Sequence, residues 1–159
     1  MTTPRLLPLA ILLTAVALIG AGCGSGSDDQ PSAADAQSAY RSIKSQITGL
    51  GESIGTAMTS ASRESDAEFA DAFAQLNVRG HAVVARLNAL EVPDDLKDER
   101  QAFSEALARG TADLTDIASA ARASDAAAAR AAVKRLIADS QQLGNARAAF
   151  ERALNDAAN

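Results

Sequence analysis

The chain has 159 residues and a formal net charge of −5, from 20 acidic and 15 basic side chains. It contains one Tyr and no Trp, whereas nucleic-acid binding favours a basic stripe with stacking aromatic side chains. Length and composition therefore allow one domain, and they argue against nucleic acid as a partner and against adsorption on anionic lipid.

The first 22 residues have the three parts of a secretory signal. A short start carries the single cation Arg5, an uncharged apolar run extends from Leu6 to Ile19, and small residues precede Cys23. The run is shorter than the roughly 20 apolar residues that a membrane-spanning helix needs. We expect cleavage of this segment; an ordinary secretory signal with an Ala-x-Ala-like site and an uncleaved anchor are the alternatives.

The tetrapeptide Gly20-Ala21-Gly22-Cys23 resembles the bacterial lipobox, with Gly20 standing where Leu is usual and Ile19 one step earlier. The resemblance covers only the first 23 residues. It implies cleavage before Cys23, transfer of a diacylglyceryl group to the Cys23 thiol, and a lipid-anchored protein that faces outside the cytoplasm. Cys23 is the only cysteine, so its acylation leaves the mature chain without a free thiol or a disulfide.

The segment after Cys23 is predicted to be a flexible tether. Residues 24–31 are Gly-Ser-Gly-Ser-Asp-Asp-Gln-Pro, which at full extension reach at most about 28 Å. The chain therefore divides into a signal peptide (1–22), a lipidated cysteine with its linker (23–31) and a folded domain (32–159).

Two helices are predicted in the first half of the folded domain. The first begins near Ser32, with Asp35 three residues later. The second begins at Ser65, where Glu68 completes a capping box, and ends at Val92-Pro93, because proline disfavours helical geometry in the preceding residue. Their apolar stripes are Tyr40, Ile43, Ile47, Leu50, Ile54, Ala57 or Met58, and Ala61, then Phe69, Phe73, Leu76, Gly80, Val83, Leu87 and Leu90.

Two further helices are predicted in the second half. The third begins around Pro93, where Asp94 and Asp95 suit a helix N-terminus, and the fourth opens at Ser124-Asp125. Their stripes are Leu96, Arg100, Phe103, Leu107, Gly110, Leu114, Ile117 and Ala121, then Val133, Leu136, Ser140, Leu143, Arg147, Phe150 and Leu154.

Four amphipathic helices of similar length with short connections predict an all-α fold, an up-down-up-down antiparallel four-helix bundle over residues 32–159. A dimer of long hairpins would satisfy the same stripes and is the alternative, with a monomer favoured. In general character the chain resembles small Ala-rich bacterial lipoproteins with helical mature domains, a resemblance that brings no site residues with it.

Counting outward from the turns at 1.5 Å per residue predicts two layers of interest. A middle layer brings together Gly80, Gly110, Ser140 and either Gly49 or Gly51, with His81 beside it. This layer is either a ligand pocket at mid-bundle or close helix packing through small residues.

A second layer, nearest the tether, brings together Tyr40, Leu87, Arg100 and Arg147. Both arginines fall on apolar stripes, where a cation needs a partner or an exit to water. The layer is either an anion-binding pocket or a place where arginine stems cover apolar surface while their charged heads reach solvent.

Known bundle chemistries do not fit the sequence. Haem ligation by Met58 and His81 fails, because the two are about 16 Å apart along the bundle axis. Di-iron bundles need inward Glu residues and Glu-x-x-His pairs, but Val78 stands three residues before His81. Structural zinc needs a set of Cys and His ligands that this sequence does not contain. Serine or cysteine catalysis needs a base beside the nucleophile, and His81 has no nucleophile at motif spacing. We expect no cofactor, no metal and no enzymatic activity.

The remaining expectation is a membrane-anchored cell-envelope lipoprotein whose bundle is an interaction or structural module for an envelope protein that the sequence does not identify. The alternative is a lipoprotein that binds a small molecule at mid-bundle, or a small anionic molecule at the arginine end.

Overall fold

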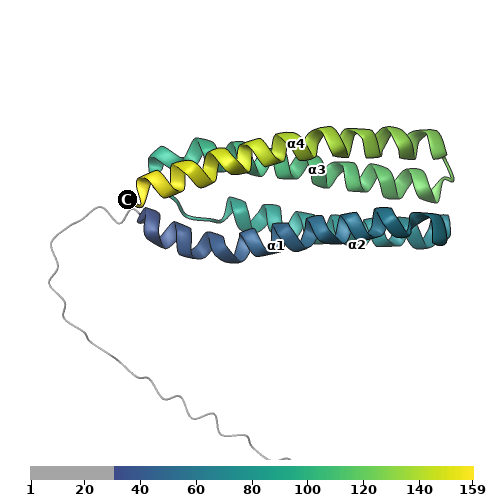
Figure 1. Cartoon of the computed structure of the whole chain (residues 1–159), viewed down its shortest axis with the longest axis horizontal. Coiled ribbons are helices and arrows are strands. Elements are labelled where there is room, and N and C mark those ends of the chain that lie inside the picture. The colour runs from purple at the N-terminus through teal and green to yellow at the C-terminus, as the bar shows by residue number, and fades with distance from the viewer. Residues whose placement is uncertain (1–30) are drawn as a thin grey trace, which may run out of the picture.

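A computed structural model describes residues 31–159 and shows a four-helix bundle, which confirms the predicted fold class. The helices are α1 (Ala33–Ser60), α2 (Asp66–Asn88), α3 (Lys97–Arg122) and α4 (Ala126–Ala157), with 3₁₀ turns η1 (Ala61–Arg63) and η2 (Asp94–Leu96). Figure 1 shows α1 beside α2 and α3 beside α4 along one long axis, with the start of α1 and the C-terminus at the same end. We call this the tether end.

Side-chain caps begin three of the helices where the sequence predicts them. Ser32 accepts a hydrogen bond from the Asp35 amide at 3.1 Å. Ser65 and Glu68 exchange the two bonds of a capping box. The Ser65 amide and hydroxyl both donate to Glu68 Oε2, and these two bonds hold the pKa of Glu68 below its ordinary value. Asp125 accepts from the amides of residues 127 and 128. Each cap satisfies amides that the first helical turn leaves without partners.

The predicted end of the second helix is wrong by one turn. α2 stops at Asn88 rather than at Val92-Pro93, and the chain then runs through a short non-helical connection. Leu90 and Val92 lie in that connection and are buried at the tether end of the core. Burying these two apolar side chains against the bundle end favours the irregular connection over another turn of helix.

The tether-end core is built around three aromatic rings. Tyr40 meets Phe150 edge-on at 5.2 Å between ring centroids, and Phe103 at 6.2 Å. Both phenylalanines are fully buried. A second core, around Phe73, Leu114 and other apolar side chains, fills the end near the α1–α2 and α3–α4 connections, which we call the turn end.

The predicted stripe of the fourth helix is only partly buried. In α4 the buried side chains are Ala132, Phe150 and Leu154. Between them, Val133, Leu136 and Leu143 are half-buried and Ser140 is exposed. The reason is that α3 packs closely against both α2 and α4, whereas α1 and α4 approach each other much less. The middle of α4 therefore faces an opening rather than a neighbouring helix.

Candidate functional site

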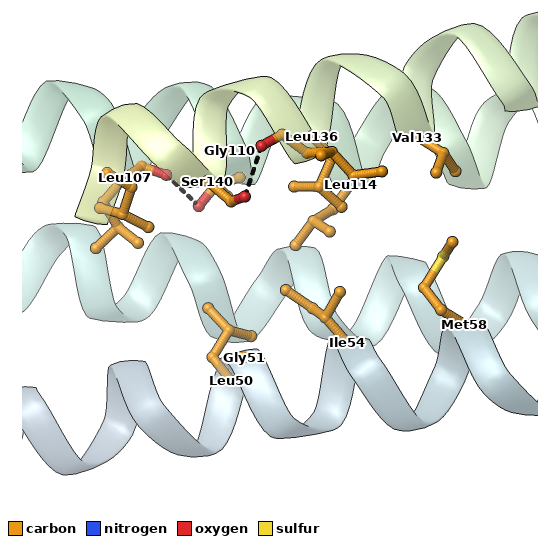
Figure 2. A pocket seen from close by; sticks show the side chains of 13 residues that line it. Leu50, Gly51, Ile54, Met58, Leu107, Gly110, Leu114, Val133, Leu136 and Ser140 are labelled. Atoms are coloured by element: carbon orange, nitrogen blue, oxygen red, sulfur yellow. Dashed lines mark hydrogen bonds between the residues drawn. The ribbon is translucent and has the colours of Figure 1, made fainter. Parts of the chain in front are cut away.

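An apolar groove of about 270 Å³ runs along this opening between α1 and α4. Residues of α1 from Leu50 to Met58 form one wall, and residues of α4 from Val133 to Leu143 form the other. Residues of α3 between 107 and 114 form the floor. Figure 2 shows Leu50, Ile54 and Met58 directed from α1 toward the side chains of α3 and α4.

Small residues help to keep the groove open. No described atom lies within 4 Å of a Cβ built on Gly51, and a Cβ on Gly110 would meet only Leu136 Cδ1, at 3.9 Å. Neither glycine is therefore required for a close helix crossing. Their missing side chains leave space in the wall and in the floor.

The groove offers a ligand almost no hydrogen-bond donors. Thr111 and Ser140 supply the hydroxyl groups of the lining. Thr111 Oγ1 donates to the Leu107 carbonyl at 2.9 Å, and Ser140 Oγ donates to the Ile137 carbonyl at 2.7 Å, the two dashed bonds of Figure 2. Because both protons are already used, a hydrogen-bond acceptor in the groove would lose its bonds to water without replacement.

The predicted middle layer is therefore part groove and part close helix packing, the two alternatives given for it. Gly51, Gly110 and Ser140 line the groove together. Gly80 instead packs on α3, where its added Cβ would lie 2.7 Å from Thr111 Oγ1 and 2.9 Å from Thr111 Cγ2. His81 is exposed on α2, a helix that contributes no residue to the groove lining within 31–159, so His81 belongs to the close-packing alternative and not to a pocket.

Gly80→Ala is expected to be less stable than Gly55→Ala by about 1–3 kcal/mol, the usual cost of overpacking. Both changes gain about the same helix propensity, but only the methyl group at 80 meets the branched side chain of Thr111, because Gly55 has open space. Urea unfolding of both variants measures the difference.

A double-mutant cycle gives the control for this prediction. Thr111→Ala removes the two atoms closest to the new methyl group, so it should cost less in the Gly80→Ala chain than in the parent. Equal stabilities of Gly80→Ala and Gly55→Ala would contradict close packing at this crossing.

At the tether end, Glu151 joins α4 to α1. Its Oε1 accepts from the Tyr40 hydroxyl at 2.9 Å and from Arg147 Nε at 2.8 Å, and it lies 3.3 Å from Lys44 Nζ. Burial alone would raise the pKa of Glu151, but the bonds from Arg147, Tyr40 and Lys44 outweigh it and lower that pKa. Burial, with the neighbouring carboxylate, raises the pKa of Tyr40.

Of the two alternatives for the layer that holds Arg100 and Arg147, the anion pocket formed by both arginines is not found. Arg147 lies with Tyr40 and Glu151, whereas Arg100 Nη1 donates to the backbone carbonyls of Asn88 at 2.6 Å and Leu87 at 3.4 Å. Arg100 thus satisfies carbonyl groups at the C-terminal end of α2, which an α-helix leaves unpaired. Each arginine is tied to a different pair of helices.

The sequence analysis missed a buried carboxylate, Asp113 on α3, which is 5% exposed. Its Oδ1 lies 3.3 Å from Arg135 Nε on α4, and the same guanidinium bonds Asp116 at 2.6 Å. Burial raises the pKa of Asp113; Arg135 opposes that shift and Asp139 adds to it. The available signal was the seven-residue spacing of Ala106, Asp113 and Ala120, a second buried stripe on a helix with neighbours on two sides.

Asp113→Asn is expected to raise the free energy of unfolding at neutral pH. The folded chain holds the Asp113 pKa above its unfolded value, so ionisation of this group costs stability once the pH exceeds about 3.8. Asparagine keeps the shape without the charge. Denaturant unfolding should show the two chains converging as the pH falls through that value.

The exposed neighbour gives the matched control. Asp116→Asn removes the other carboxylate bound to Arg135, but this surface pair should contribute less than about 1 kcal/mol. A loss of stability in Asp113→Asn at neutral pH would show that its bond to Arg135 outweighs the cost of burial.

Several expectations concern other chemistry or lie elsewhere in the chain. Within residues 31–159 there is no group of three His, Cys, Asp or Glu side chains arranged to hold a metal ion. None of the helices in that range has both the length and the hydropathy to cross a membrane. Cys23, the signal peptide 1–22 and nearly all of the linker 23–31 lie outside the described residues.

Comparison of the chain with protein-family models, curated proteins and solved structures finds no match.

Proposed function

We propose that this protein is a lipid-anchored lipoprotein of the bacterial cell envelope, whose bundle binds a small apolar ligand in the groove between α1 and α4. The groove is the observation that carries the binding function. It is apolar on all three sides, and its two hydroxyl groups are bonded within their own helices.

The size of the groove supports a slender ligand. Its volume of about 270 Å³ is nearly twice that of an apolar cavity of about 150 Å³ that binds benzene. It lies just below the range of about 300–1,000 Å³ that is usual for drug-sized ligands. Filling it would remove the half-buried side chains Val133, Leu136 and Leu143 from water, at about 25 cal/mol for each Å² of apolar surface.

The absence of enzymatic activity is part of the same proposal. The groove lining, taken from the described part of the chain, contains no ionisable side chain that could serve as an acid or base. Catalysis by Thr111 or Ser140 would need a neighbouring base to remove the hydroxyl proton.

The anchor rests on the sequence of residues 1–31. The signal-like segment 1–22, the lipobox-like tetrapeptide and the single Cys23 together support attachment through a lipid on Cys23, outside the cytoplasm. The folded domain would then stay within about 28 Å of the membrane surface.

The second candidate is an interaction or structural module for an envelope protein. Among residues 31–159, two large apolar side chains are exposed, Val78 on α2 and Ile137 on the rim of the groove, at 69% and 58%. The single chain buries two apolar cores of its own, which supports a monomer that would offer these surfaces. Crosslinking in intact cells that finds no reproducible neighbour would count against this candidate.

Gly110→Leu is expected to weaken binding of decanol, a neutral alkyl probe, by at least about tenfold, because the new side chain would occupy the groove. Gly144→Leu is the matched control: Gly144 lies on α4 with open space around it and outside the lining. Calorimetric titration of the full chain carrying Cys23→Ser, which cannot be lipidated, measures both affinities. Equal binding by the two variants would rule out the groove as the site.

Cys23→Ala is expected to abolish lipid attachment and release the protein from the membrane. The test is growth with an alkyne-tagged fatty acid, followed by detection of the tag on the protein and by fractionation of the cells. Ser25→Ala, a change in the tether, should leave both readouts unaltered. A tag that persists in Cys23→Ala would contradict this attachment site.

A further inference from the structure

We propose that the groove is a binding site for a single-chain anionic amphiphile, such as a long-chain carboxylate, with its tail between α1 and α4 and its head beside Lys44 and Arg147. This inference rests on the proposed function and names the class of ligand. Its evidence is the position of the charged side chains at the two ends of the groove.

Both cations continue the walls of the groove toward the tether end. Lys44 precedes Gly51 by seven residues and Met58 by fourteen, a spacing that keeps all three on one face of α1. Arg147 follows Leu143 by four residues and Ser140 by seven, so it lies on the groove face of α4. The cations therefore stand about 10 Å beyond Gly51 and about 6 Å beyond Leu143 along the helix axes.

Contacts across the two helices confirm that these side chains face the same interface. Lys44 of α1 and Arg147 of α4 both bind Glu151, at 3.3 Å and 2.8 Å. One carboxylate thus serves two cations, and the cluster carries a surplus positive charge. The Lys44 side chain is 48% exposed, so an incoming anion can reach it from solvent.

The turn end of the bundle has the other sign. A depression at the turn end is lined by Glu64, Asp66 and Asp125, with Arg130 as its one cation. An anionic head is repelled from this end and attracted to the tether end. The charges therefore fix one orientation for the ligand, with the end of the tail toward the turns.

The dimensions fit an acyl tail. From Lys44 to Met58 along α1, and from Arg147 to Val133 along α4, the distance is about 21 Å. A tail that spans one leaflet of a bilayer is about 15 Å long, half of the hydrocarbon thickness. The groove and its charged mouth can thus hold one such tail and its head, with part of the tail open to solvent.

The chemistry of the groove interior requires the tail of the ligand to lie inside the groove and the charged head to lie outside it. Its hydroxyl groups already donate to helix carbonyls, so a head group inside would have no donors. Donors with full positive charge are found one to two helical turns away, at Lys44 and Arg147. Charge-assisted bonds of this kind are about twice as strong as neutral ones.

The test compares three probes with the same tail: decanoate, decanol and decyltrimethylammonium, each below its micelle concentration. Calorimetric titration of the full chain carrying Cys23→Ser is expected to show decanoate binding about tenfold or more tighter than decanol, and the cation weakest. Lengthening the carboxylate should raise the affinity by up to about fourfold per methylene until the groove is filled.

Two variants change the head site in opposite directions. Lys44→Gln should weaken decanoate several-fold and leave decanol unchanged, whereas Glu151→Gln, which removes the competing carboxylate but keeps an acceptor for Tyr40, should strengthen decanoate. Arg152→Gln is the matched control, an exposed cation on α4 outside the cluster.

The possible outcomes separate this inference from the function on which it rests. Equal affinity for the three probes, or a loss in Arg152→Gln as large as in Lys44→Gln, overturns the recognition of an anionic head and leaves the apolar groove standing. Binding of none of the probes overturns both. A preference for the cationic probe likewise overturns the recognition of an anionic head.

Discussion

The arrangement of the bundle depends on the close packing of α3 against its two neighbours. Gly80 allows α2 to approach until Thr111 lies where a Cβ would otherwise be, and α3 buries a face that includes Phe103, Leu114 and Ile117. With α2 and α4 both held against α3, α1 must span the remaining side. It meets α4 closely only where large or charged side chains reach across, and this leaves the groove.

The tether end shows how that remaining side is fastened. Tyr40 places its ring in the aromatic core and its hydroxyl on Glu151, so one side chain links apolar packing to the polar bridge between α1 and α4. Gln37 and Asn155 add a hydrogen bond of 2.7 Å beyond it. The same bridge that holds the helices together provides the surplus positive charge at the mouth of the groove.

Half-buried Glu151 and buried Asp113, both within residues 31–159, have opposite effects on stability. Glu151 has three donors, which lower its pKa in spite of burial, so its ionised form stabilises the fold above its unfolded pKa. Asp113 has one cation and a like-charged neighbour, and its pKa is raised, so its ionised form is a cost. The number of donors aimed at each carboxylate decides the sign.

The sequence by itself determined where three of the four helices begin and that four of them form the domain, because caps such as Ser65 with Glu68 and stripes of period 3.6 are local properties. The third helix, expected near Pro93, begins at Lys97 after the 3₁₀ turn η2 and has no side-chain cap. The tertiary structure decided the end of α2 at Asn88, because the burial of Leu90 and Val92 depends on what they meet. It also showed that Gly80 and Gly110 have different roles. A glycine in an apolar stripe can allow a close helix crossing, as Gly80 does, or leave space beside the helix, as Gly110 does, and only the neighbouring atoms distinguish the two cases. The tertiary structure also placed Arg147 beside Tyr40 and Arg100 against the C-terminal end of α2. Counting residues from the turns gives only the position of a side chain along the bundle axis, whereas the partner of a long side chain depends on the neighbouring helix that it reaches.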